Sequence, residues 1–140
     1  LLVPDHIVIR ELNETMNRHP ETVGFIYDGF PRTILQAEML DQMLMANGAA
    51  IDLVISVDVD EEELFKRLMG RSEDSGRSDD AEDIIWKRIE VYKNQTFPLI
   101  SFYRQQGKLA KINGMQPVEK VFSDITSAIG AYLTVKNTGA

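Results

Sequence analysis

The sequence contains no cysteine, which excludes disulfide bonds and thiolate metal sites. It has no apolar run near the roughly 20 residues that a membrane-spanning helix needs. No signal-peptide pattern opens it either. These absences predict a soluble protein of the cytoplasm that has no membrane partner.

Positive charge is also scarce, with 15 lysines and arginines against 22 acidic residues. The formal net charge of -7 and the pI near 4.8 argue against a broad nucleic-acid-binding face. Local clusters of arginine can still bind an anion, because binding responds to the local field. At 140 residues and 44% hydrophobic content, the chain is expected to form one globular domain.

Strand and helix patterns alternate along the chain, and the strand patterns are continuously apolar. The predicted strands are residues 23–27, 51–59 and 109–113. The first predicted helix begins at Asp5, and the second covers residues 33–47 and stops at Gly48. Asp60 and Glu63 are predicted to form the cap and capping box of a third helix, and a long fourth helix from Asp80 is predicted to be interrupted or kinked near Pro98. The last predicted helix covers residues 117–133, with Val121, Phe122, Ile125 and Ile129 inward. This order predicts an α/β domain, a parallel sheet with helices on both faces.

The stretch after the first predicted strand has the composition of a ligand site. Ligands of such sheets bind at the carboxyl ends of the strands, where Asp28 would lie. A carboxylate there suits Mg²⁺ held through water, and Gly29 allows a ligand close to the backbone. Pro31 restricts the turn, and Arg32 is suited to bidentate phosphate contact. The alternative is an ordinary turn with a buried Asp–Arg pair and no ligand.

Four arginines gather around the polar segment 71–80, which is expected to be an exposed loop. They are Arg67, Arg71, Arg77 and Arg88. Arg67 and Arg71 are four residues apart, so both side chains project from one helix face. This excess of arginine in an acidic protein predicts an anion. The alternative is a solvated surface neutralised by nearby carboxylates, although lysine is the usual residue of such surfaces.

Residues 25–36, FIYDGFPRTILQ, resemble the signature segment of the adenylate kinases. The likeness continues through "FKRLMGR", "SGRSDD", "IIWKRIEVYKNQTFPLI" and "KINGMQPVEKVF", and "LVPDHIVI" resembles the monophosphate-binding region. The resemblance implies the phosphate-loop nucleoside monophosphate kinase fold, with residues 1–20 ending the AMP-binding region and 71–80 forming a short lid. It also implies the reaction ATP + AMP to two ADP, with Mg²⁺.

The resemblance implies a role for each matching residue. Asp28 would hold Mg²⁺ through water, Gln36 would contact the AMP adenine, and Gln116 would offer a backbone carbonyl to the ATP adenine. The implied AMP-binding residues are Leu1, Leu2, Val3, Gly29, Phe30, Pro31, Arg32, Gln36, Arg77 and Arg88. The implied ATP-binding residues are Arg67, stacked on the adenine, Arg71 and Gln116. The implied catalytic residues are Asp28, Arg32, Arg71, Arg77 and Arg88. These roles fit phosphoryl transfer, which depends mainly on positioning and charge neutralisation.

The family's Gly-rich phosphate loop, G-x-x-x-x-G-K, does not occur among the nine glycines of this sequence. The sequence is therefore expected to be the C-terminal portion of the family's core, about 50 residues short at typical element lengths. It begins at Leu1 and not at Met. The central strand of the sheet would be missing, and exposed strand edges tend to pair with other chains. We expect the fragment to be inactive and to self-associate, whereas the intact enzyme would be a monomer.

Two other functions stay open. One is a non-catalytic nucleotide-binding remnant of the family, and the other is a kinase that uses CMP or UMP as acceptor. Thr33 and Gln36 favour AMP, because the pyrimidine kinases of this family usually differ just after the Pro-Arg pair. The match of all five implied catalytic residues favours an enzyme over a remnant.

Overall fold

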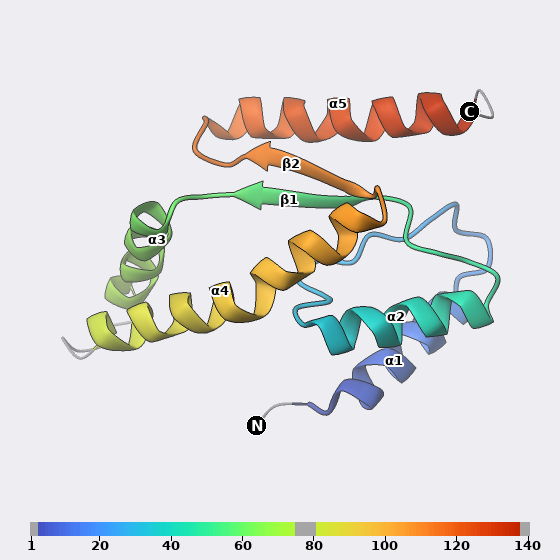
Figure 1. Ribbon diagram of the computed structural model, residues 1–140, viewed down its shortest axis with the longest axis horizontal. Coiled ribbons are helices and arrows are strands. Elements are labelled where there is room, and N and C mark those ends of the chain that lie inside the picture. The colour runs from blue at the N-terminus through green and yellow to red at the C-terminus, as the bar shows by residue number, and fades with distance from the viewer. Residues whose placement is uncertain (1–2, 75–80, 138–140) are drawn as a thin grey trace. The chain divides into compact units, whose positions relative to one another are not determined.

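A computed structural model describes the backbone of residues 3–74 and 81–137 and the side chains of residues 3–70 and 82–136. The chain divides into two compact units, Leu1–Ile51 and Asp52–Ala140. Within the described residues there are five helices and two parallel strands, so the predicted α/β class is confirmed (Figure 1). No described helix is long and apolar enough to cross a membrane.

The first unit contains two helices, α1 (Asp5–Asn17) and α2 (Ile34–Ala46). Thr33 caps α2 through its side chain, which accepts a hydrogen bond of 3.1 Å from the backbone N–H of Gln36. The helix ends at Ala46 with Asn47 as its C-cap, and Gly48 follows with φ 72°. The predicted helix over residues 33–47 is therefore confirmed.

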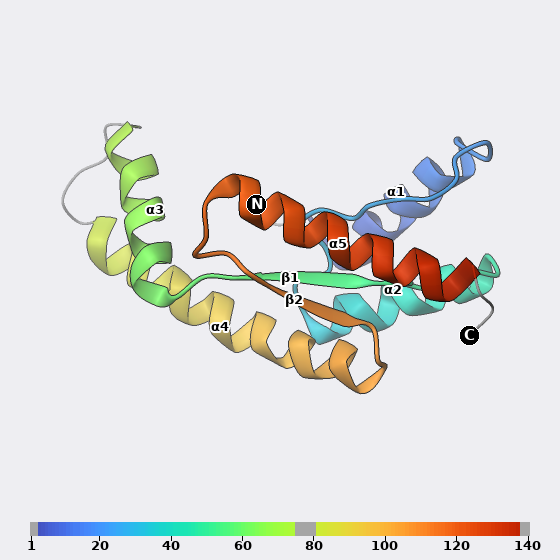
Figure 2. The same cartoon turned by 90° about the horizontal axis from the view of Figure 1, so that it is seen from above.

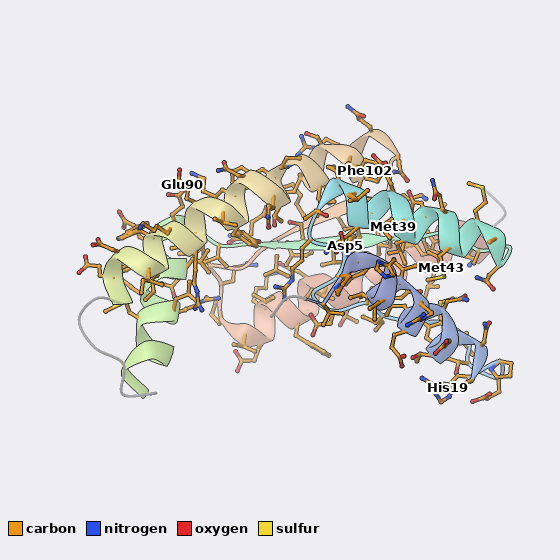
Figure 3. All side chains as sticks on the ribbon, turned by 90° about the horizontal axis from the view of Figure 1, so that it is seen from below. Asp5, His19, Met39, Met43, Glu90 and Phe102 are labelled. Atoms are coloured by element: carbon orange, nitrogen blue, oxygen red, sulfur yellow. The ribbon has the colours of Figure 1, made fainter. Side chains whose placement is uncertain are left out.

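The two helices of the first unit pack on each other. The Asn47 side-chain amide donates a hydrogen bond of 2.9 Å to Oδ1 of Asn13 in α1. Figure 3 shows Met39 and Met43 on the side of α2 that meets α1. The predicted apolar stripe of α2 is also confirmed, because Ala37, Leu40 and Leu44 are buried.

The predicted strand over residues 23–27 is wrong. This run has no strand assignment, and Val23 and Ile26 are 107% and 92% exposed. A β-branched and aromatic run becomes a strand only when a neighbouring strand satisfies its backbone hydrogen bonds. The described residues form two strands, β1 (Val54–Asp58) and β2 (Leu109–Asn113), which pair only with each other, so residues 23–27 have no partner strand among them.

The second unit is built on β1 (Val54–Asp58) and β2 (Leu109–Asn113), which pair in parallel from Val54 opposite Leu109 to Asp58 opposite Asn113. Both were predicted, and β1 is shorter than its predicted range of 51–59. Two parallel strands need a long crossover, which α3 (Glu61–Asp74) and α4 (Ala81–Gln105) belong to.

The two crossover helices pack against each other (Figures 1 and 2). The rings of Phe65 and Trp86 stack with centroids 4.6 Å apart, and Lys93 forms an ion pair with Glu61. Asp60 caps α3 as predicted, since its Oδ1 accepts a hydrogen bond of 2.8 Å from the backbone N–H of Glu63. In a complete capping box the Glu63 carboxylate would also accept a hydrogen bond from the backbone N–H of Asp60. This second bond does not form, because the Glu63 carboxylate pairs with Arg67 instead.

The expected loop at residues 71–80 is wrong over its first four residues, which are helical. Residues 71–74 continue α3, because neither glycine nor proline occurs between Gly70 and Gly76. Residues 75–80 lie outside the described residues. The helix α4 is continuous through Pro98 to Gln105, so the predicted interruption does not occur, and the alternative of a kink near Pro98 stays a prediction. Leu99 and Tyr103 are buried in this part of α4, and such packing outweighs the backbone hydrogen bond that proline cannot make.

The last helix, α5 (Val118–Asn137), contacts β2, and Figure 1 shows it on the side of the two strands opposite α4. The arrangement agrees with helices on both sides of the sheet. Two predicted inward residues are wrong, because Phe122 is 69% and Ile129 37% exposed, whereas Val121 and Ile125 are partly buried. The helix face toward β2 is narrower than the sequence pattern suggested.

Candidate functional site

In the first unit, the segment from Asp28 to Arg32 forms a turn that folds back on itself. Gly29 has φ 77°, a backbone conformation that residues with a Cβ atom rarely adopt. The peptide bond between Phe30 and Pro31 is cis. The Arg32 side chain donates from Nε to the carbonyl of Gly29 at 2.8 Å. The turn therefore places the guanidinium of Arg32 directly over its own backbone.

The amide group of Gln36 is held at both of its ends. Its Oε1 accepts a hydrogen bond of 2.7 Å from the backbone N–H of Arg32, and its Nε2 donates one of 2.9 Å to Oδ1 of Asp5. Asp5 lies in the first turn of α1, as Figure 3 shows. The structure thus brings together Arg32 and Gln36, two of the predicted AMP-binding residues, and adds Asp5, which the sequence did not indicate.

Asp28 presents a carboxylate that could contact a cation. The residue is exposed, and no contact to its side chain is seen within the described residues. The same part of the chain contains no cluster of three or more acidic or histidine side chains able to enclose a metal ion. Mg²⁺ usually binds proteins through one or two carboxylates, with water and substrate phosphates completing its shell. A single free carboxylate fits that kind of site and does not fit an all-protein cage.

In the second unit, Arg67 of α3 contacts the loop that follows β2. Its Nε donates to Oε1 of Glu63 at 3.1 Å, and its Nη2 donates to the carbonyl of Gly114 at 3.4 Å. Glu63 lies one helical turn before Arg67, so the pair holds the guanidinium along the helix. Arg67 therefore contacts the loop at a position two residues before Gln116, and Gln116 is another predicted ATP contact.

The loop after β2 is fixed by hydrogen bonds of its own. The Gly114 N–H donates to the carbonyl of Asp58 at the end of β1 at 2.7 Å, and the Met115 N–H donates to Oδ1 of Asn113 at 2.9 Å. The Gln116 side chain donates to the Asn113 carbonyl at 3.0 Å. The loop has no freedom to move away from β1 without breaking these contacts.

A carboxylate of α5 also holds this loop. Asp124 Oδ2 accepts a hydrogen bond of 2.8 Å from Nε2 of Gln116, and its Oδ1 accepts one of 2.8 Å from Nζ of Lys120. These donors lower the pKa of the Asp124 carboxyl below its usual 3.8, with Lys120 the larger cause and Gln116 the second. Asp124 is therefore charged at neutral pH, which strengthens its hold on Gln116.

Gly114 has a steric role in the loop. A Cβ atom at this position would lie 2.8 Å from the Asp58 carbonyl oxygen and from methyl groups of Val57 and Val59. Real Cβ atoms do not approach other atoms so closely, so only glycine fits here. The loop can approach the end of β1 because position 114 has no side chain.

The other predicted site residues are less constrained. Arg88 lies in the first half of α4, it is exposed, and within the described part of the chain its side chain has no partner. Val3 is exposed, and Phe30 and Pro31 are partly buried. Leu1, Leu2 and Arg77 lie outside the described residues, and so does the side chain of Arg71. Their predicted roles stay predictions.

Comparison with known proteins decides the family. The family model described as adenylate kinase matches residues 1–108. An adenylate kinase of Maricaulis maris is 47% identical over 128 residues, which are 91% of this chain and 68% of that protein. The chain belongs to the adenylate kinase family.

Two further relatives extend the comparison. An adenylate kinase of Phocaeicola vulgatus is 44% identical over the same shares of both chains. One from a Synechococcus species is 46% identical over 121 residues, which are 86% of this chain and 62% of that protein. Adenylate kinases are nucleoside monophosphate kinases, a class of phosphotransferases. The resemblance read from the signature segment is confirmed at the level of the family.

Reasoning from the sequence missed three residues of these networks, namely Asp5, Gly114 and Asp124. An acidic residue in the first turn of a helix is normally explained by the helix dipole, and Asp5 carries no other sequence signal. Asp124 forms an i,i+4 pair with Lys120, which also has an ordinary explanation on a helix surface. Only Gly114, next to the end of a predicted strand, had a local signal that could have indicated a close backbone approach.

Proposed function

We propose that the complete gene product transfers the γ-phosphoryl group of ATP to AMP and so forms two molecules of ADP. Family membership supports the reaction class. The observation that carries the choice of substrate is the Gln36 amide, which is held by the backbone N–H of Arg32 and by the Asp5 carboxylate. The Gln36 amide can hydrogen-bond the edge of a base, and the residue that it contacts, Arg32, has a guanidinium that can bind a phosphate. A nucleoside monophosphate needs both kinds of contact.

The remaining roles follow from charge and position. Arg32 binds the AMP phosphate, and Arg67 contacts the ATP adenine next to the loop that contains Gln116. Arg71, Arg77 and Arg88 neutralise the phosphates that react. A transferred phosphoryl group spreads negative charge over its oxygens, and the enzyme lowers the barrier mainly by positioning the two substrates and stabilising that charge. No protein nucleophile is needed for this chemistry.

Mg²⁺ is the metal that this function implies, and Asp28 is the residue that would hold it through water. When bound, the ion neutralises charge on the ATP phosphates and orients them. The exposed Asp28 carboxylate is suited to that indirect contact. A cytoplasmic location and a monomeric intact enzyme stay predictions.

The alternative acceptors CMP and UMP can be tested in the same assay. We expect ADP formation from ATP and AMP to exceed phosphorylation of CMP and UMP by at least about 100-fold in kcat/KM, the scale expected where a site hydrogen-bonds a specific base edge. Comparable rates with a pyrimidine monophosphate would show a different acceptor. Binding of ATP with no transfer to any of the three acceptors would indicate a non-catalytic member of the family.

A further inference from the structure

The hydrogen bonds of Gln36 leave part of its amide group available to a ligand. A side-chain amide has two N–H donors and an oxygen with two lone pairs. One N–H of Gln36 donates to the Asp5 carboxylate at 2.9 Å, and one lone pair of its oxygen accepts from the backbone N–H of Arg32 at 2.7 Å. One N–H and one lone pair of Gln36 have no partner within the described residues. These two groups are what Gln36 can present to a base.

The two partners of Gln36 impose the same orientation on its amide. The Asp5 carboxylate can only accept a hydrogen bond when it is ionised, and the backbone N–H of Arg32 can only donate one. If the amide rotated by 180°, its NH₂ group would face the Arg32 N–H and its oxygen would face the Asp5 carboxylate. Both contacts would become repulsive, and both partners would lose a hydrogen bond, at the greater cost for the partly buried Asp5 carboxylate.

A fixed amide orientation discriminates between purines. Adenine offers an acceptor at N1 beside a donor, its exocyclic amino group, so it complements the N–H and the lone pair of Gln36. A 6-oxopurine such as hypoxanthine has the reverse pattern, with a donor at N1 beside an acceptor oxygen. Such a base would pair well only with the rotated amide. The cost of rotating the amide therefore becomes a cost of binding the wrong base.

We propose that Asp5 is a positioning residue for base specificity, which locks the Gln36 amide in the orientation that accepts adenine and rejects 6-oxopurines. The proposal rests on the proposed function, because it requires that Gln36 contact the base of the acceptor nucleotide. Asp5 itself need not touch the nucleotide. It acts through Gln36, 31 residues away in the sequence and on the neighbouring helix.

Asp5 also has an ordinary structural role, which the test must separate from the proposed one. The same hydrogen bond ties α1 to α2, and a carboxylate in the first turn favours a helix. Asp5→Ala removes all of these contributions together. Asp5→Asn is more informative, because its side-chain amide can hydrogen-bond Gln36 in either orientation. It keeps a tie between the helices and removes the group that can only accept.

The experiment measures kcat/KM for AMP and for IMP, the hypoxanthine nucleotide, in the complete gene product. In Asp5→Asn we expect the preference for AMP over IMP to fall by about tenfold, the scale of one lost hydrogen-bond preference. The KM for ATP and the midpoint of thermal unfolding should stay close to the wild-type values. Glu11→Gln is the matched control, because it removes one negative charge from the same helix at a residue that contacts Arg18 and not Gln36.

Each other outcome overturns the proposal in a distinguishable way. An unchanged preference in Asp5→Asn, with the wild type active on AMP, overturns the role of Asp5 and leaves the proposed function intact. A reduced preference that persists in the Gln36→Ala background shows that Asp5 does not act through Gln36. A wild-type protein that does not phosphorylate AMP removes the proposed function, and the inference with it.

Discussion

At the residue scale, the candidate side chains fall into two groups. Arg32, Gln36 and Arg67 are held by hydrogen bonds to their own unit, so their positions are set before any nucleotide binds. Asp28 and Arg88 are exposed, and the described residues offer their side chains no partner. A charged group that no described residue contacts is available to phosphates and metal ions, because no contact to the described part of the chain has to break first.

Arg88 tests the second group. In the complete gene product, Arg88→Ala is expected to lower kcat by a factor of about 10²–10⁴, the scale of one lost charge-stabilising donor. Arg88→Lys should show most of the same decrease in kcat, because lysine retains the charge but lacks the two-pronged guanidinium that binds a phosphate through two hydrogen bonds. The midpoint of thermal unfolding should barely change for either variant, since Arg88 is exposed. Near-normal transfer by Arg88→Ala would remove this residue from the site.

Gly114 tests the packing of the loop after β2. Gly114→Ala is expected to destabilise the protein by about 1–3 kcal/mol, because the new Cβ atom would overlap the backbone at the end of β1. Gly130→Ala is the control, since nothing lies within 4 Å of a Cβ atom at that position in α5. It should be neutral or stabilising by up to about 1 kcal/mol. Denaturant unfolding of both variants measures the difference, and equal midpoints would contradict the close approach.

At the scale of elements, the start of α5 is joined to the loop after β2 through one carboxylate. Asp124 accepts hydrogen bonds from Gln116 in the loop and from Lys120 in the helix. The loop is joined in turn to β1 through Gly114 and to α3 through Arg67. Two strands and two helices therefore meet at a few residues, and the predicted contacts of the ATP adenine lie among them.

The titration of Asp124 tests this junction. Its pKa is lowered in the folded protein, so the ionised carboxylate contributes stability above the usual value of 3.8. That contribution is lost as the pH falls through the lowered pKa. An NMR titration should show the Asp124 pKa rising toward its usual value in Lys120→Ala, and rising less in Gln116→Ala, because Lys120 is the larger cause.

The acid response of the loop provides the complementary measurement. Wild-type amide signals of residues 113–116 should shift as Asp124 is protonated, because the carboxylate then loses its charge-assisted hold on Gln116. In Asp124→Asn that shift should disappear, although the amide oxygen can still accept a hydrogen bond. A loop that responds to acid equally in both proteins would show that another group controls it.

At the scale of the whole molecule, the sequence of 140 residues contains no Gly-rich phosphate loop. Converging backbone N–H groups and a lysine hold the β- and γ-phosphates in nucleotide enzymes that have such a loop. Without them, ATP would be held only by arginines and Mg²⁺. Positioning, which supplies much of the catalysis in phosphoryl transfer, would then be poor.

The 140 residues alone are therefore expected not to form ADP from ATP and AMP at a rate near that of the complete gene product. The measurement uses purified residues 1–140 of verified mass and monomeric state. The large apolar side chains that are more than half exposed also predict self-association, which sedimentation would detect. These exposed residues include Val23, Ile26, Met45, Phe97, Val118 and Phe122. Normal turnover from a verified monomer would contradict the role assigned to the phosphate loop.

Much of the fold could be predicted because its signals are local. Thr33 and Asp60 cap their helices as expected, Gly48 follows the end of α2, and residues 109–113 form β2. Each of these depends on a few neighbouring residues, such as a side-chain acceptor before a helix or an apolar run between turns. The signature around Asp28 was sufficient to identify the family for the same reason: the motif is contiguous in the sequence.

The sequence by itself determined the order of the five helices and of the two strands β1 and β2, the family, and the types of residue available to bind phosphate. Only the tertiary structure decided that residues 23–27 form no strand, that Asp5 holds the Gln36 amide, and that position 114 has no room for a side chain. Each of these depends on groups far apart in the chain. A strand requires a partner, a carboxylate acts on the amide that packing brings to it, and a steric limit exists only where two segments meet.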